Sequence, residues 1–131
     1  YLAWVEGARL PSPFAARQPI ARVPHGPLTI HAAAAHGRPS LTRVRVLRRA
    51  GARTLVAAQP ITGRPDQIRI HLAAAGAPIV GDPLFGPGGV PKSDAPPRNG
   101  GYFLHSAGVK FAHPVSGARV TLRSLPDWLD G

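Results

Sequence analysis

The strongest constraint on the fold is one predicted helix, because the sequence marks both where it begins and where it ends. The other apolar runs of the chain are patterned like β-strands. The signal for this helix lies in Thr62–Leu72 (TGRPDQIRIHL), and the helix should begin at about Pro65. Proline is tolerated at a first helical position because its missing N–H has no intrahelical partner there. The helix should continue to about Ala75, since Gly76 and Pro78 follow and these residue types commonly end helices. One principal helix is therefore predicted.

The two faces of this helix should differ in chemistry. Residues three and four apart share a helix face. The apolar face, which should pack on a sheet, is formed by Ile68, Leu72 and Ala75. The polar face is formed by Arg64, Gln67 and His71.

Two charged residues of the segment have more specific expectations. Arg69 lies between the two faces, where packing can hold a side chain that still reaches a cleft. Asp66 is expected in the first turn, where a negative charge complements the helix dipole. It precedes Arg69 by three residues, the spacing of a helical ion pair.

Strands are predicted on both sides of the helix. Residues 1–7 are apolar and β-prone, and 41–49 and 53–61 flank a short turn as a hairpin would. Residues 109–113 and 118–123 alternate with period two and form a second hairpin, before a closing helical turn at 125–129. The predicted class is a mixed α+β fold, with a mainly antiparallel sheet and one principal helix.

Residues 8–38 carry five prolines, which exclude a long helix and a central strand. We expect a surface excursion with short strands at 20–23 and 28–31. Its histidines (His25, His31 and His36) match no metal-site spacing, so solvated or partly buried histidines are expected. The Gly/Pro-rich turn at 81–89 lacks the ending of a phosphate-binding loop, and 90–101 should form a loop.

The charge balance indicates a polyanionic partner. Sixteen Lys+Arg face six Asp+Glu, for a net charge of +10, and all but Lys92 and Lys110 are arginines. Guanidinium suits phosphate better than ammonium does, so nucleic acid is the first hypothesis. An Arg-rich solvated surface is the alternative. The chain has no cysteine, which excludes thiolate metal sites and fits a reducing compartment such as the cytoplasm. It also has no apolar run long enough to span a membrane.

The ordered motifs resemble a known family. The run TGRPDQIRIHL, followed by GAPIVGDPLFG, is similar to the T-G-R-x-H-Q-I-R-x-H-L and G-x-P-x-x-G-D-x-x-Y-G signatures of the RluA-type large-subunit rRNA pseudouridine synthases. Three more pieces agree in order, namely YLAWVEG, LHSAGVKFAHPVSG and SLPDW. The resemblance spans essentially the whole chain and corresponds to the later part of the family's catalytic domain.

The resemblance implies isomerisation of uridine to pseudouridine in RNA, with rRNA as the expected partner and without a metal or an organic cofactor. In this chemistry an Asp attacks the nucleotide, and the base is detached, turned and rejoined through carbon. By motif, Tyr1 matches the Tyr that lies against the base and assists proton removal. Arg69 matches the Arg that pairs with the Asp. Arg64, Gln67 and His71 fall on the same segment, as RNA-contacting or site-supporting residues.

The chain departs from the family's pattern at three points. The family's nucleophile lies in an H-R-L-D-x-x-T-S-G motif that is absent from these 131 residues. Asp66, in place of the usual His, is expected to be an ion-pair or dipole partner and not a substitute. Phe85 replaces the usual Tyr, and Asp82 should fix its turn through its side chain.

These departures leave three interpretations. We expect residues 1–131 to be an N-terminally truncated catalytic domain that is inactive alone, with an unpaired strand edge near 1–5 or at the first hairpin. A non-catalytic basic RNA-binding module is the second interpretation. A basic domain that docks on acidic protein is the third.

Overall fold

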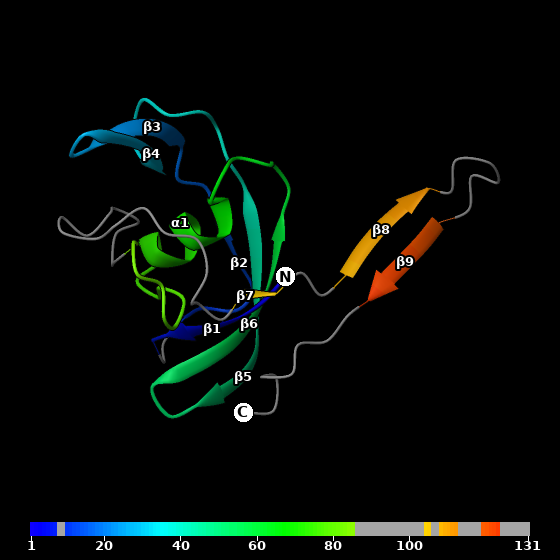
Figure 1. Cartoon of the computed structure of the whole chain (residues 1–131). Coiled ribbons are helices and arrows are strands. Elements are labelled where there is room, and N and C mark those ends of the chain that lie inside the picture. The colour runs from blue at the N-terminus through cyan, green and yellow to red at the C-terminus, as the bar shows by residue number, and fades with distance from the viewer. Residues whose placement is uncertain (8–9, 86–103, 106–107, 113–118, 124–131) are drawn as a thin grey trace.

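A five-stranded antiparallel sheet and one helix organise the computed structural model, which describes residues 1–7, 10–85, 104–105, 108–112 and 119–123 (Figure 1). The sheet has the order β2-β5-β6-β1-β7. Its strands are β1 (Leu2–Glu6), β2 (Phe14–Ala16), β5 (Thr42–Ala50), β6 (Arg53–Pro60) and β7 (Leu104–His105). All of its pairs are antiparallel. With helix α1 (Gln67–Ala74), this confirms the predicted mixed α+β class.

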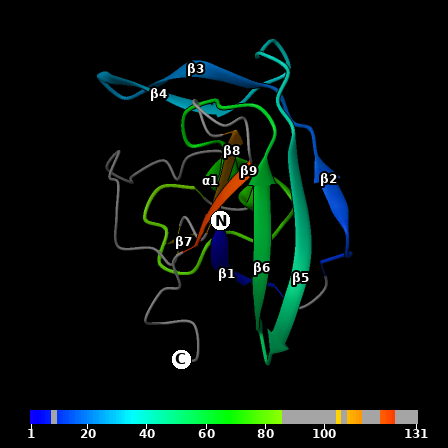
Figure 2. The ribbon, with the colours of Figure 1, turned by 90° about the vertical axis from the view of Figure 1, so that its right-hand side faces the viewer.

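The hairpin β5–β6 forms the long axis of the sheet (Figure 2). Val44 lies opposite Ala58, and the register shifts once, between Val46 and Arg48. Val44 is buried while Arg43 is exposed, as expected where alternate side chains point to opposite faces. The first predicted hairpin is thereby confirmed. The short strand β2 on its outer edge was not predicted.

Helix α1 ends as predicted but begins later. Asp66 occupies the N-cap position with a left-handed φ of 56° and makes no side-chain cap, so the expectation that it lies in the first turn is wrong. The backbone turns at Asp66 before the helix starts. At the other end Gly76 has a φ of 84°, which glycine adopts without steric cost. Ala75 lies beyond the last helical residue and is exposed, so it does not pack on the sheet.

The helix is covered on two sides. Towards the sheet, Ile68 and Leu72 pack in a cluster with Val5, Val44 and Val56. On its other side lies a separate antiparallel hairpin, formed by β3 (Ile20–His25) and β4 (Leu28–Ala33), as Figure 1 shows.

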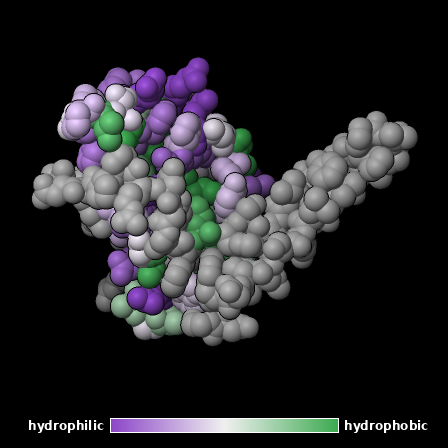
Figure 3. Space-filling view, viewed as in Figure 1, coloured by the Kyte–Doolittle hydropathy of each residue, from purple (hydrophilic) through white to green (hydrophobic). Residues whose placement is uncertain are grey.

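The second cluster joins this hairpin to the helix through Ile20, Ile30 and Ile70, with Phe85 beside them. Hydrophilic residues gather on the outside of the same region (Figure 3). Seven of the eight residues of α1 are consequently buried. Gln67 and His71, from the predicted polar face, are therefore interior, because the hairpin and the start of β5 cover them.

Strand β1 is not an open edge. It pairs with β6 on one side and with β7 on the other. Two backbone bonds extend that second side, since Glu6 N–H donates to the Pro78 carbonyl at 2.8 Å and Val80 N–H donates to the Trp4 carbonyl at 2.9 Å. The expected unpaired edge near residues 1–5 is wrong, because the segment after α1 returns along it.

The remaining predictions fall partly outside the described residues. Strands β8 (Gly108–Ala112) and β9 (Arg119–Arg123) pair antiparallel, which confirms the second hairpin. The loop at 90–101 and the helical turn at 125–129 lie outside the described residues. His25 and His31 are half-buried and His36 is exposed, as expected. In the described part of the chain, no helix has the length and apolar character to cross a membrane.

The two-sided burial of α1 predicts a large difference between two leucines. Leu72 is fully buried and Leu28 is half exposed. Leu72→Ala should lower the free energy of unfolding by about 2–5 kcal/mol, because it removes contacts and leaves a cavity. Leu28→Ala should change it by no more than about 0.5 kcal/mol. Urea unfolding followed by circular dichroism measures both, and equal losses would contradict the described core.

Candidate active site

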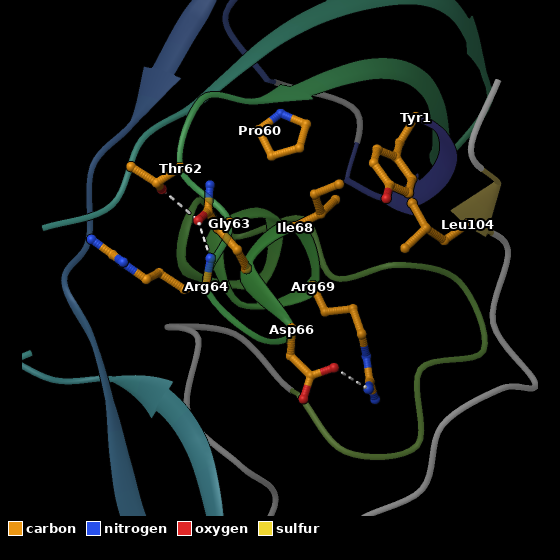
Figure 4. A pocket seen from close by; sticks show the side chains of 10 residues that line it. Tyr1, Pro60, Thr62, Gly63, Arg64, Asp66, Ile68, Arg69 and Leu104 are labelled. Atoms are coloured by element: carbon orange, nitrogen blue, oxygen red, sulfur yellow. Dashed lines mark hydrogen bonds and ion pairs between the residues drawn. The ribbon is translucent and has the colours of Figure 1, made fainter. Parts of the chain in front are cut away.

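A pocket of about 300 Å³ opens where β1, the end of β6 and the start of α1 meet (Figure 4). Its apolar wall includes Tyr1, Ile68 and Leu104, while Asp66 and Arg69 supply charge on another side. Four of the five predicted site residues line this pocket, and they are Tyr1, Arg64, Gln67 and Arg69. His71 is not among the lining residues.

Arg69 is the most buried charged group of the pocket, with 2% of its side chain exposed. Its Nε donates to Asp82 Oδ2 at 2.9 Å and its Nη2 to Asp82 Oδ1 at 2.8 Å. A third bond, from Nη1 to Asp66 Oδ1, measures 3.1 Å. The guanidinium carbon lies 5.0 Å from the centre of the Phe85 ring, within cation–π range. The buried cation is thus held by two carboxylates and an aromatic face.

Asp82 is fixed from both sides. Besides Arg69, its Oδ1 accepts from the backbone N–H of Leu84 at 2.9 Å and of Phe85 at 3.2 Å. Burial raises the pKa of the Asp82 carboxyl, but the hydrogen bonds from Arg69, Leu84 and Phe85 and the Arg69 charge together hold that pKa below its usual value. Asp82 therefore stays ionised, and its predicted role in fixing the turn is confirmed.

Asp66 has a more exposed position than Asp82. About 31% of its side chain is accessible, and it forms the predicted i,i+3 ion pair with Arg69. Asp66 also lines the pocket, so its carboxylate contacts the guanidinium of Arg69 from the pocket side.

Gln67 connects the start of the helix to strand β5. Its Nε2 donates to the Leu41 carbonyl at 2.8 Å and to Thr42 Oγ1 at 2.9 Å. Its Oε1 accepts from the Thr62 hydroxyl and, at 3.1 Å, from the Arg64 N–H. All four bonds are internal to the fold, so Gln67 positions the turn that leads into the pocket.

His71 continues the same polar chain. Its Nε2 donates to the Gln18 carbonyl at 2.9 Å, since a carbonyl oxygen can only accept, and its Nδ1 accepts from the Thr42 hydroxyl at 2.7 Å. Burial lowers the pKa of His71 more than the bond to the Gln18 carbonyl raises it. His71 is therefore a neutral imidazole, fully buried. Of the two roles predicted for it, this geometry fits support of the site.

Arg64 lies half-buried at the rim of the pocket. Its Nη2 donates to the Pro39 carbonyl at 3.0 Å. Tyr1 is 42% exposed, and its carbonyl accepts from the Ala58 N–H at 2.8 Å. The β1–β6 ladder therefore continues through the residue that carries the ring, and this ladder sets where the ring lies on the pocket wall.

Two contributors were missed by sequence reasoning. Asp82 was expected to fix only its own turn, yet it also pairs with Arg69 thirteen residues earlier. Thr42 joins Gln67 to His71 but carries no sequence signal beyond a buried strand position. Among the described residues, no group of three or more His, Cys, Asp or Glu side chains is arranged to hold a metal ion.

Comparisons with known proteins agree on one family. A family model described as RNA pseudouridylate synthase matches residues 1–74. An uncharacterised RNA pseudouridine synthase of Synechocystis is 46% identical over 107 residues, covering 79% of this chain and 37% of the relative. Ribosomal large subunit pseudouridine synthase C of Escherichia coli K12 is 38% identical over 93 residues, covering 70% of this chain and 29% of the relative.

A solved structure has the same fold. The human RNA pseudouridylate synthase domain containing 1 protein superposes with a TM-score of 0.72 at 26% identity, over 98% of this chain and 54% of that protein. The chain thus spans about a third of the length of the curated relatives it matches and about half of this solved one.

The lowered pKa of His71 predicts how stability depends on pH. The unfolded chain binds a proton at this residue near pH 6.5, whereas the folded chain binds it only at lower pH. The His71 contribution is therefore present above about pH 6.5 and is lost as the pH falls towards the folded pKa. The free energy of unfolding should fall by up to about 1.4 kcal/mol per pH unit in that window.

The control for this measurement is His71→Asn, which removes the titrating ring and leaves the other histidines in place. Its stability should decline less steeply between pH 6.5 and 5 than that of the unmodified chain. Superimposable slopes in urea titrations across this range would contradict the burial of a neutral His71.

Proposed function

Because this chain belongs to the RNA pseudouridylate synthase family, we propose that it forms the later part of a catalytic domain that isomerises uridine to pseudouridine in RNA. The expected substrate is ribosomal RNA in the cytoplasm. The observation that carries the proposal is the pocket that brings the buried guanidinium of Arg69 and the ring of Tyr1 to one cavity. Relatives from Vibrio cholerae and Escherichia coli are named ribosomal large subunit pseudouridine synthase C.

Arg69 serves the nucleophilic step in this proposal. An attacking carboxylate must be ionised and oriented in a cleft, and a neighbouring guanidinium lowers its pKa and fixes its direction. The described part of the chain places Arg69 on the pocket wall. The nucleophilic Asp would come from a segment outside these 131 residues, since the H-R-L-D motif does not occur in them. We therefore propose that residues 1–131 form one part of a single catalytic domain, and that the segment with the nucleophilic Asp belongs to the same domain.

Tyr1 and its apolar neighbours would receive the base. A uridine within folded RNA has to be unstacked before its glycosidic bond can be remade, and a flipped base is stabilised by aromatic and apolar walls. A cavity of about 300 Å³ is at the small end of ligand sites, which suits one nucleobase. Tyr1, Ile68 and Leu104 provide the wall.

The reaction balances without an external oxidant or reductant. The bond from the ribose C1′ to the base N1 breaks and a bond from C1′ to C5 forms, while C5 loses a proton and N1 gains one. The Tyr1 ring is proposed to assist removal of the proton from C5. Arg64 at the rim is proposed to contact RNA, while Gln67 and His71 act through the polar chain that fixes the helix.

The second candidate is a non-catalytic RNA-binding module. The absence of the nucleophile motif from the sequence favours this module. The net charge of +10 would favour RNA binding by either the enzyme or the module. The sequence of the complete reading frame distinguishes the enzyme from the binding module. An H-R-L-D motif upstream of Tyr1 supports the enzyme, and a natural start at Tyr1 supports the module.

Arg69→Ala in the complete polypeptide should strongly slow the release of tritium from RNA labelled at C5 of uridine. Loss of a group that orients the nucleophile should lower the rate by at least about 100-fold. The matched control is Arg53→Ala, which removes an exposed arginine at the opposite end of β6 from Pro60. It should keep at least about half of the rate, since it neutralises only one of many basic side chains. Equal losses in both variants would mean that Arg69 contributes only charge.

The 131-residue chain by itself should release no tritium above background, because it lacks the nucleophile motif. It should still bind RNA, with an affinity that falls steeply as salt rises. Cooperative thermal unfolding must first show that the isolated chain is folded. Tritium release by this chain alone would contradict the assignment of the nucleophile to another segment.

A further inference from the structure

We propose, building on the function proposed for Arg69, that Asp82 is a positioning residue of the reaction. Asp82 holds the guanidinium of Arg69 in one orientation at the pocket and does not itself meet the substrate. The sequence motif that contains Asp82, GDPLF at 81–85, would then support catalysis in addition to fixing its own backbone turn.

The first observation is the geometry of the pair. Nε and Nη2 of Arg69 donate to separate oxygens of Asp82 at 2.9 and 2.8 Å. Two parallel bonds between a planar guanidinium and a planar carboxylate fix the orientation of the guanidinium as well as its position. They also direct the Nη1 edge towards Asp66, which lines the pocket.

The second observation is that Asp82 is itself anchored. Only 1% of its side chain is exposed, and the backbone N–H groups of Leu84 and Phe85 both donate to its Oδ1. The Phe85 ring then packs against the guanidinium. The turn at 82–85 therefore provides a rigid support, so a displacement of Asp82 would move Arg69 with it.

The third observation is location. Arg69 lines the pocket and Asp82 does not, so Asp82 acts through Arg69. Asp66 contacts the same guanidinium from the pocket side, by one bond of 3.1 Å and with 31% of its side chain exposed. Among the described residues the two carboxylates are thus unequal, and Asp82 holds the guanidinium more firmly.

The experiment compares three carboxylate-to-amide variants of the complete polypeptide. Asp82→Asn should lower kcat on the order of 100-fold, the cost of misplacing a reacting group by about 1 Å, and should leave KM within about threefold. Asp66→Asn should cause less than about a tenth of that loss. Glu6→Gln alters an exposed carboxylate at the end of β1 and should have no effect.

A double-mutant cycle separates positioning from a general loss of structure. If Asp82 acts only through Arg69, Asp82→Asn should cause no more than about a threefold further loss in an Arg69→Ala background. Phe14→Ala removes a half-buried ring from the edge strand β2, whose residues do not line the pocket, and provides a destabilised control that should keep its kcat below its unfolding temperature. Should Asp82→Asn fail to fold, Asp82→Glu should fold and keep a kcat within about tenfold of the unmodified enzyme.

The outcomes distinguish this proposal from the one on which it depends. If the unmodified polypeptide forms no pseudouridine, the proposed function fails. If it is active and Arg69→Ala lowers its rate at least about 100-fold, while folded Asp82→Asn keeps its kcat within threefold, positioning by Asp82 is overturned. A loss from Asp82→Asn that is as large in the Arg69→Ala background as in the unmodified one also overturns it.

Discussion

The buried side chain of Arg69, of which 2% is exposed, determines much of the surrounding structure. Removing a cation from water is costly unless it is paired and hydrogen-bonded, so Arg69 requires a carboxylate that is buried with it. Asp82 meets that requirement and in turn fixes the backbone of Leu84 and Phe85. The segment after the helix is thereby drawn against it, and residues 78–80 return along strand β1.

The same burial explains the polar chain on the other side of the helix. Because the β3–β4 hairpin and the start of β5 cover α1, Gln67 and His71 cannot be hydrated and must be satisfied internally. Thr42 completes the chain by linking both of them, and Gln18 ends it through its carbonyl. The helix is thus held by directional bonds as well as apolar packing, which fixes the side chains that face the pocket.

Local patterns were sufficient for much of the fold. Alternation at 41–49 and turn chemistry around Gly51 predicted the β5–β6 hairpin, and Gly76 marked the end of the helix. They failed where tertiary contacts decide the outcome. The polar face of α1 became interior because a distant hairpin covers it, and helical periodicity carries no information on such a cover.

The candidate site, like the fold, was only partly predictable from the sequence. The family resemblance assigned Arg69 and Tyr1 to one site, and the pocket contains both. The contact between Asp82 and Arg69 depends on the path of the chain after the helix, so only the three-dimensional structure reveals it. The i,i+3 pair of Asp66 with Arg69 was predictable because it is local. What distinguishes the two carboxylates is their burial, which the sequence does not contain.

The most direct test is an experimental structure of the complete polypeptide bound to RNA. The oxygens of a carboxylate from outside residues 1–131 should lie within about 3 Å of the Arg69 guanidinium, a charge-assisted hydrogen-bond distance. The two bonds to Asp82 should be retained and the target base should lie against Tyr1. An RNA bound elsewhere, with the Arg69 pocket empty of both base and carboxylate, would contradict the proposed function.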